Sequence, residues 1–172
     1  MSSLLTLVSF QPPTRDFVRS FTVRAERTAG GLLLHYRLDG DIACLRVPVR
    51  REPRQVDELW KHTCFEAFIA GASDGAYREF NFAPSTEWAA YAFTGYRAGM
   101  APISTPTPEI RVEATSDRLE LRVRLAIGTT GPRKLSLTAV LEDDAGAITY
   151  WALRHAPDRP DFHHPAGFIL EV

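Results

Sequence analysis

The chain contains 172 residues, of which 45% are hydrophobic and 24% charged, and its formal net charge is -1 at pH 7. This composition is typical of a globular protein, and the length fits a single domain, which we expect to span residues 1–172. The near-zero charge offers no positively charged surface for a nucleic acid or an anionic membrane, so neither is an expected partner.

The first segment, MSSLLTLVSF, contains a short apolar run that is expected to form a strand. No basic residue precedes the run and no small-residue cleavage site follows it, so it does not resemble a signal peptide. No apolar run approaches the roughly 20 residues that cross a bilayer. Cys44 and Cys64 lack the spacing of metal ligands, and we expect reduced thiols and a cytoplasmic location, in a bacterium or a eukaryote.

Alternation of apolar and polar residues is the main pattern in the rest of the chain. It is clearest at residues 32–38 and 119–127, as in strands with one buried face. Turn-forming residues separate such segments at regular intervals, and only residues 54–60 have the spacing of a short helical turn. About ten or eleven strands joined mostly by hairpins predict an all-β protein with two packed antiparallel sheets, a β-sandwich. Longer loops at residues 98–108 and 156–167 are expected at one end of it.

Three consecutive segments, residues 64–70, 77–83 and 88–94, are expected to form an antiparallel meander. We expect its turns at residues 73–74 and 84–87. Because side chains alternate along a strand, these turn positions determine which residues share a face, and a shift of one residue would exchange the faces.

One face of this meander is expected to join the core, and the other to bind a ligand. The core face carries Phe65, Ala67, Ile69, Phe80, Phe82, Ala89, Tyr91 and Phe93. The opposite face carries Cys64, Glu66, Phe68, Tyr77, Glu79, Asn81, Ala83, Trp88, Ala90 and Ala92. This second face combines small residues with carboxylates, an amide and aromatic rings, which together suit a polar small molecule. The alternative is an ordinary outer face on which Glu66 and Glu79 are solvated or paired with Arg78 or Arg97.

Three stretches resemble the DOMON-like domains of small bacterial proteins, which are related to family 9 carbohydrate-binding modules and to haem-binding DOMON domains. They are LWKHTCFEAFI (59–69), YREFNFAPSTEWAAYAFTGYRAGM (77–100) and RPDFHHPAGF (159–168). The resemblance covers most of the chain and implies an immunoglobulin-like or jelly-roll-like sandwich that binds a sugar or a haem and is not a catalyst. Lys61 and His62 depart from the family 9 pattern, because they replace its acidic pair.

The resemblance raises the question of which residues would contact a sugar or a haem. The candidates for stacking on a sugar ring are the three tryptophans Trp60, Trp88 and Trp151, of which Trp88 is preferred, and each could equally belong to the core. A haem would need axial ligands, for which the sequence offers Met100, His62, His155, His163 and His164.

The segment that contains two adjacent histidines suggests an enzymatic alternative. Asp161, His163 and His164 are close in sequence, and with His62 they would supply the ligand types of zinc or iron. Adjacent histidines on an extended segment point in opposite directions, so we favour a loop held by hydrogen bonds of Asp161 and His163. Glu66 and Glu79 would be diagonal neighbours at a distance compatible with the two carboxyl groups of a glycosidase.

The sequence and the resemblance together favour a non-catalytic module for a carbohydrate or a similar polyhydroxylated small molecule, without cofactor or metal. The residues expected to contact the ligand are Glu66, Glu79, Asn81, Trp88, Tyr77, His62, His163 and His164. A metal-dependent or carboxylate-based hydrolase is the alternative, and its residues would be His62, Asp161, His163 and His164 with Glu66. Haem binding is a third possibility, and the sequence leaves the oligomeric state open.

Overall fold

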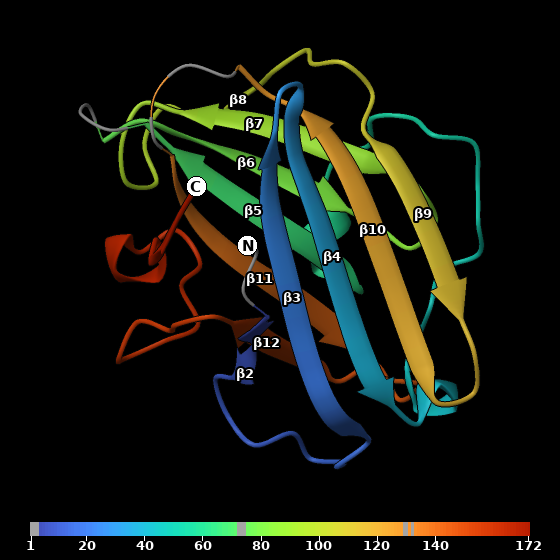
Figure 1. Ribbon diagram of the computed structural model, residues 1–172. Helices are drawn as coiled ribbons and strands as arrows, with labels where there is room; N and C mark the ends of the chain where they lie inside the picture. The colour runs from blue at the N-terminus through green and yellow to red at the C-terminus, as the bar shows by residue number, and fades with distance from the viewer. Residues whose placement is uncertain (1–3, 72–74, 129–130, 132) are drawn as a thin grey trace.

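The computed structural model describes residues 4–71, 75–128, 131 and 133–172. These residues form two antiparallel sheets that pack face to face, and they contain no α-helix (Figure 1). The predicted antiparallel two-sheet β-sandwich is therefore confirmed. No helix in this part of the chain is long and apolar enough to span a membrane.

The smaller sheet, in front in Figure 1, contains five strands in the order β1, β3, β4, β10 and β9. Their bounds are Leu5–Thr6 for β1, Val18–Thr28 for β3, Gly31–Gly40 for β4, Glu109–Ala114 for β9 and Arg118–Ala126 for β10. The alternating segments predicted as strands at residues 32–38 and 119–127 overlap β4 and β10, which pair with each other. Their apolar side chains point into the core, because every second residue of a strand faces the same side.

The larger sheet contains β2, β12, β11, β5, β6, β7 and β8 in that order, and β13 also pairs with β11. Their bounds are Val8–Ser9 for β2, Cys64–Ala70 for β5, Tyr77–Phe82 for β6, Trp88–Phe93 for β7, Ala101–Pro102 for β8, Lys134–Glu142 for β11, Ile148–Ala152 for β12 and Leu170–Glu171 for β13. Short 3-10 helices lie at Ile42–Cys44 (η1), Leu59–Lys61 (η2) and Pro165–Gly167 (η3). The second of them overlaps the helical turn predicted for residues 54–60.

The two sheets enclose a large apolar core in which aromatic rings from both sheets meet. Phe65 of β5 lies 5.9 Å from Phe21 of β3 and 5.3 Å from Tyr36 of β4, measured between ring centroids. The Tyr36 hydroxyl donates a hydrogen bond of 2.7 Å to the backbone carbonyl of Glu66. This bond connects the two sheets at Glu66, whose side chain points away from the core, to the outer face of the larger sheet.

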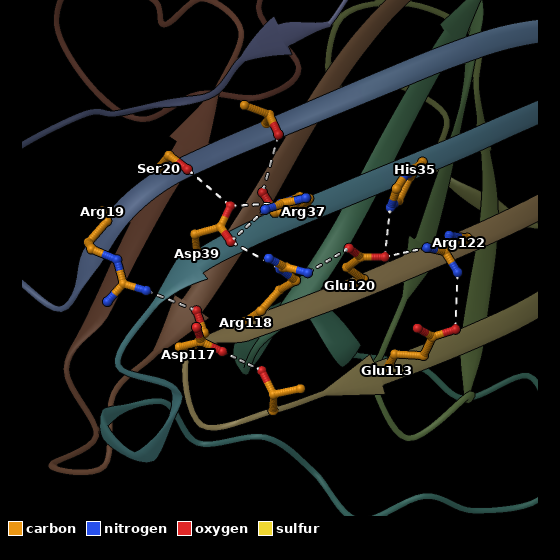
Figure 2. A network of polar contacts seen from close by, with 12 residues as sticks. Arg19, Ser20, His35, Arg37, Asp39, Glu113, Asp117, Arg118, Glu120 and Arg122 are labelled. Carbon is orange, nitrogen blue, oxygen red and sulfur yellow. Dashed lines mark hydrogen bonds and ion pairs between the residues drawn. The ribbon is translucent and has the colours of Figure 1, made fainter.

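Charged side chains of alternating sign cover the outer face of the smaller sheet (Figure 2). Arg37 and Arg118 donate to Asp39 at 2.8 and 3.1 Å, and they hold the pKa of this carboxyl at about 2. Farther along the same face, Glu120 accepts hydrogen bonds from His35, at 3.2 Å, and from Arg122. The paired charges on this face match an ordinary solvated sheet surface.

The first hairpin of the meander has the predicted register. Glu66 lies opposite Asn81 and Phe68 lies opposite Glu79 in the pairing of β5 with β6. The core face predicted for these two strands is buried between the sheets, and the side chains of Glu66, Phe68 and Glu79 point to the outer face. The turn predicted at residues 73–74 lies outside the described residues.

The second hairpin differs from the predicted register by one residue. Asn81 lies opposite Ala89, where Ala90 was expected, and Glu79 lies opposite Tyr91. The shift exchanges the two faces of β7. Ala89, Tyr91 and Phe93 belong to an apolar cluster on the outer face, whereas Trp88 and Ala90 belong to the core between the sheets. The placement of Trp88 in a ligand-binding face was therefore wrong.

The turn between β6 and β7 explains this shift. The backbone N–H of Ala83 donates to the carbonyl of Glu87 at 2.9 Å, so residues 84–86 form a three-residue loop in place of the expected four. Its last residue, Thr86, has a φ of 73°, the left-handed conformation that commonly ends such a loop. The Thr86 hydroxyl donates to the carbonyl of Arg51 at 2.7 Å, which helps to hold a conformation that β-branched residues rarely adopt.

Candidate functional site

A cavity of about 360 Å³ opens on the outer face of the larger sheet. Glu66 and Phe68 of β5 and Glu79 of β6 line its floor. Its other lining residues are Trp60, Phe93, Arg97, Met100, Val140, Tyr150, Pro160, Phe162 and His163. The volume lies at the lower end of the range of small-molecule sites, so the cavity suits a small ligand.

The segment that follows β12 folds back over this face and forms one side of the cavity. Asp161, which is 5% exposed, holds the segment in place. It accepts hydrogen bonds from Arg97, at 2.7 and 3.1 Å, from Tyr96 and from the backbone N–H of His163. These donors lower the pKa of Asp161 to about 2 although burial opposes the shift. The prediction of a loop held by Asp161 and His163 is confirmed.

Apolar and aromatic side chains join this loop to the sheet. Phe68, Tyr77 and Phe93 form a cluster on the outer face, against which Phe162 packs. Tyr77 and Phe93 stack with their ring centroids 4.7 Å apart, and Phe68 meets the ring of His163 at 5.1 Å in an edge-to-face contact. The covering loop is thus fixed by packing as well as by Asp161, and the cavity has a defined shape.

Glu66 is the most unusual residue of the cavity floor. It is 2% exposed, and its Oε1 atom has no hydrogen-bond partner among the described residues. Its Oε2 atom accepts one bond of 3.3 Å from the hydroxyl of Thr138 on β11. Burial, and to a lesser extent the neighbouring Glu79, raise the pKa of Glu66 well above its usual value.

Glu79 is better satisfied than Glu66. It is 5% exposed, and its Oε1 atom accepts a hydrogen bond of 2.8 Å from the amide of Asn81. Its Oε2 atom lies 3.8 Å from Nε2 of His163. Burial raises the pKa of Glu79, while Asn81 and Arg97 oppose this shift. Within the described residues neither glutamate forms an ion pair with Arg78 or Arg97, and both are buried. The face that carries them is therefore not an ordinary outer face with solvated or paired carboxylates.

His163 is held in a chain of hydrogen bonds. The backbone N–H of Arg97 donates to the hydroxyl oxygen of Tyr77 at 3.2 Å, and the same hydroxyl lies 2.8 Å from Nδ1 of His163. Burial and the positive charge of Arg97 lower the pKa of His163 to about 4. The imidazole is therefore neutral at pH 7, and Tyr77 positions it beside Glu79.

The remaining residues predicted to contact a ligand lie elsewhere. His62 pairs with Glu142 at 2.7 Å, and Nδ1 of His164 accepts the backbone N–H of Ala166 at the start of η3. Neither histidine lines the cavity, and Trp88 is 4% exposed in the core. The predicted residues in or next to the cavity are thus Glu66, Glu79, Asn81, Tyr77 and His163.

The metal ligands of the enzymatic alternative do not come together. His62 and His164 have the separate partners described above, and Asp161 is occupied by Arg97 and Tyr96. No group of three or more histidine, cysteine, aspartate or glutamate side chains in the described ranges could hold a metal ion. The alternative of a metal cluster of His62, Asp161, His163 and His164 therefore does not fit the structure.

A haem with two protein ligands would need two free axial ligands that face each other across the cavity. Met100 and His163 line the cavity, but Nδ1 of His163 is bonded to Tyr77 and its Nε2 faces Glu79. His155, the remaining candidate, bonds through Nε2 to the backbone carbonyl of Val8. These residues do not fit a haem with two protein ligands.

Several residues that line the cavity do not follow from the sequence pattern. Tyr150 and Phe162 come from segments distant from the meander, and Phe93 was placed on the core face because of the register shift. Trp60 was named as a sugar-stacking candidate but ranked below Trp88. The structure reverses this order, because Trp60 lines the cavity and is 44% exposed.

No family model matches the sequence, and no curated protein matches it. A solved structure from Bacteroides uniformis ATCC 8492, which carries the provisional name of carbohydrate-binding protein, has a TM-score of 0.70 at 16% identity. The match covers 98% of this chain and 84% of that one.

Two structures of family 9 carbohydrate-binding modules from Caldicellulosiruptor kristjanssonii are also similar. The complex with glucose has a TM-score of 0.57 at 7% identity and covers 94% of this chain and 81% of the module. The complex with cellotriose has a TM-score of 0.53 at 6% identity, with coverages of 90% and 73%. The chain therefore has the β-sandwich fold of these modules.

Proposed function

We propose that the protein is a non-catalytic module that binds a carbohydrate, or a similar polyhydroxylated small molecule, in the cavity above Glu66. The observation that carries this proposal is the Oε1 atom of Glu66, which is buried at the cavity floor and has no hydrogen-bond partner among the described residues. Buried polar atoms normally have a partner, and a hydroxyl group of a ligand would provide one.

The walls of the cavity support a ligand that also has apolar surface. Trp60, Tyr150 and Phe162 line the cavity, and the indole of Trp60 is partly exposed. A sugar ring has apolar C–H faces that pack on aromatic rings and hydroxyl groups that bond to carboxylates and amides. The cavity offers both kinds of surface within a volume of about 360 Å³.

The structural comparisons agree with this choice of ligand class. Two of the similar structures are carbohydrate-binding modules in complex with glucose and with cellotriose. The sequence stretches at 59–69, 77–100 and 159–168 further lead us to propose that the chain belongs with the bacterial DOMON-like proteins.

The carboxylate-based hydrolase is less well supported than binding. Glu66 and Glu79 both project from one sheet face into the cavity floor. Glycosidases use two carboxyl groups at a set separation on either side of the scissile bond, but any two glutamates on adjacent strands can meet that separation. The arrangement of Glu66 and Glu79 therefore does not by itself indicate cleavage.

A saccharide panel tests the proposed function through Trp60. We expect at least one monosaccharide or short oligosaccharide to raise the melting temperature of the wild type, and Trp60→Ala to weaken its binding about tenfold by calorimetry. Val49→Ala is the matched control, because Val49 is 82% exposed and does not line the cavity.

Three outcomes would argue against this function. The absence of a response to every saccharide, or equal affinities of the wild type and Trp60→Ala, would contradict binding in this cavity. Incubation of the bound oligosaccharide with the protein should leave it intact, and the release of shorter sugars would favour the hydrolase.

A further inference from the structure

The cavity floor carries two buried carboxyl groups without a bound basic side chain. Glu66 and Glu79 are 2% and 5% exposed, and no lysine or arginine in the described part of the chain forms an ion pair with either. Arg97 borders the cavity, but its Nε and Nη2 atoms bind Asp161 at 3.1 and 2.7 Å. Buried carboxylates normally require a counter-charge, which the protein does not place on this floor.

His163 does not provide this counter-charge. The Tyr77 hydroxyl already accepts the backbone N–H of Arg97, so its own proton is free to be donated to Nδ1 of His163. We therefore assign the ring proton of His163 to Nε2, 3.8 Å from Oε2 of Glu79. The buried imidazole, with a pKa of about 4, is neutral in this arrangement.

The floor also offers more hydrogen-bond acceptors than donors. Oε1 of Glu66 has no partner among the described residues, and its Oε2 receives one bond of 3.3 Å from Thr138. Glu79 accepts one bond of 2.8 Å from Asn81. A ligand group that fits this floor must donate hydrogen bonds, and an ammonium group donates three and accepts none.

Aromatic side chains complete the surroundings of a cation. Trp60, Tyr150 and Phe162 line the cavity together with Phe68 on the floor. The faces of aromatic rings attract ammonium groups, and the attraction is larger where water is excluded. Carboxylates below and aromatic rings around them thus favour a positively charged group over a neutral one.

We propose that the cavity binds a saccharide that carries a protonated amine, with the ammonium group at Oε1 of Glu66 as the counter-charge of the Glu66 and Glu79 pair. This inference rests on the function proposed above and specifies the chemical class of the ligand. The hydroxyl groups of a neutral sugar could donate hydrogen bonds to the same oxygen atoms. A neutral sugar brings no positive charge, however, so a proton would have to neutralise the negative charge of Glu66 and Glu79.

Binding of an amine is coupled to proton release in this arrangement. Burial raises the pKa of both glutamates, so the free protein retains a proton that an ammonium group displaces. The other ionisable groups around the pair are Tyr36, Cys64, Tyr77, Tyr91, Arg97 and His163. Burial raises the pKa of Tyr36 and of Cys64, so both stay neutral and add no negative charge beside the pair.

Calorimetric titration with matched sugars tests this inference. The probes are glucose, glucosamine and N-acetylglucosamine, with the corresponding galactose and mannose sets, at about pH 6.5, where a sugar amine is protonated. We expect at least one amino sugar to bind about tenfold more tightly than both of its neutral counterparts. Its binding heat should change with the ionisation enthalpy of the buffer, as proton release requires.

A pair of variants connects this preference to Glu66. Glu66→Gln should reduce the ratio of amino-sugar to neutral-sugar affinity about tenfold, because the charge that attracts the amine is lost. Glu113→Gln should leave the ratio unchanged, because the Glu113 side chain is 69% exposed on the other sheet.

The outcomes separate this inference from the proposed function. If neutral sugars bind as tightly as the amino sugars, the inference is overturned and saccharide binding stands. If no sugar of any set binds, both are contradicted. If Glu66→Gln does not fold, the wild-type preference and the proton release decide the question.

Discussion

Glu66 and Glu79 are acidic residues in surroundings that disfavour their negative charge. They lie on one face of adjacent strands, and the only hydrogen bonds from side chains to their carboxyl groups in the described residues come from Thr138 and Asn81. Without a ligand, the folded protein therefore holds protons on these groups more tightly than the unfolded chain does.

The raised pKa of Glu66 determines how Glu66→Gln should affect stability. The stabilisation from a raised carboxyl pKa is complete below the unfolded value of 4.5 and is lost as the pH rises through the folded value. Glutamine has no charge to bury, so the variant should be more stable than the wild type near pH 7, by on the order of 1 kcal/mol. Urea unfolding at several pH values should show that this gain increases with pH.

The control for this measurement is Glu113→Gln, in which an exposed carboxyl group is replaced. Its stability should differ from that of the wild type by no more than about 0.5 kcal/mol. A loss of several kcal/mol in Glu66→Gln would contradict this account, since it would mean that the Glu66 carboxylate is a structural partner of the fold.

The alternation of side chains along the strands was sufficient to identify the acidic residues of the site, but it did not identify its tryptophan. Glu66, Glu79 and Asn81 follow from the alternation of side chains in one hairpin, and the structure places all three on the same face. The roles of Trp60 and Trp88 depend on packing between distant segments. A tryptophan can pack in a core or stack on a sugar ring, so its residue type does not separate the two roles.

At the scale of elements, the two hairpins of the meander show what sets a register. Because β7 carries apolar residues on both faces, its sequence does not show which face points into the core. The length of the preceding turn therefore decides which face is buried between the sheets. Thr86 takes a left-handed conformation that its β-branched side chain disfavours. A glycine or asparagine at this position would have indicated the three-residue loop in the sequence.

The loop at residues 156–167 depends on Asp161, and its removal should loosen one side of the cavity. The pKa of Asp161 falls from 3.8 to about 2, so its stabilisation is present above about pH 4 and is lost as the pH falls toward 2. Asp161→Asn should lower the free energy of unfolding by about 2 kcal/mol at pH 7. It should also increase amide hydrogen exchange in residues 156–167.

Asp158→Asn is a matched control, because Asp158 is an exposed carboxylate of the same loop. It should change neither the stability nor the hydrogen exchange of the loop appreciably. Equal effects of the two substitutions would show that Asp161 does not hold the loop in place.

At the scale of the whole molecule, the class of fold could be predicted and the neighbours within each sheet could not. Alternating segments and regular turns are sufficient to indicate a sandwich. The pairing of β11 with β5 and that of β10 with β4 join segments far apart in the chain. Turn chemistry does not encode such pairings, and the cavity requires them because Val140 and Tyr150 come from β11 and β12.

The opposing shifts in the cavity also predict how the stability of the whole molecule depends on pH. The lowered pKa of His163, from 6.5 to about 4, destabilises the fold as the pH falls below 6.5, whereas the raised pKa of Glu66 has the opposite effect. The raised pKa of Glu79 acts in the same direction as that of Glu66, so the free energy of unfolding should decline less as the pH falls below 6.5 than His163 alone would cause. Below about pH 4 it should fall steeply, because the unfolded chain then binds protons at Asp39 and Asp161 that the folded protein binds only near pH 2.

Urea unfolding of the wild type and of Glu66→Gln over this pH range tests whether the pKa shifts of His163 and Glu66 have opposite effects on stability. Without Glu66 one of the opposing shifts is removed, so the decline in stability as the pH falls below 6.5 should be steeper than in the wild type. Equal pH profiles of the wild type and the variant would contradict the assignment of opposing shifts to these two residues.

The most direct test of saccharide binding in the cavity is an NMR titration that follows the indole N–H signals of the three tryptophans. Trp60 lines the cavity, whereas Trp88 and Trp151 are buried in the core, so each molecule contains its own controls. Addition of the best-bound sugar should shift the Trp60 signal in a saturable manner, with much smaller changes for the other two. A saturable response that leaves Trp60 unchanged, or no response to any saccharide, would contradict the account.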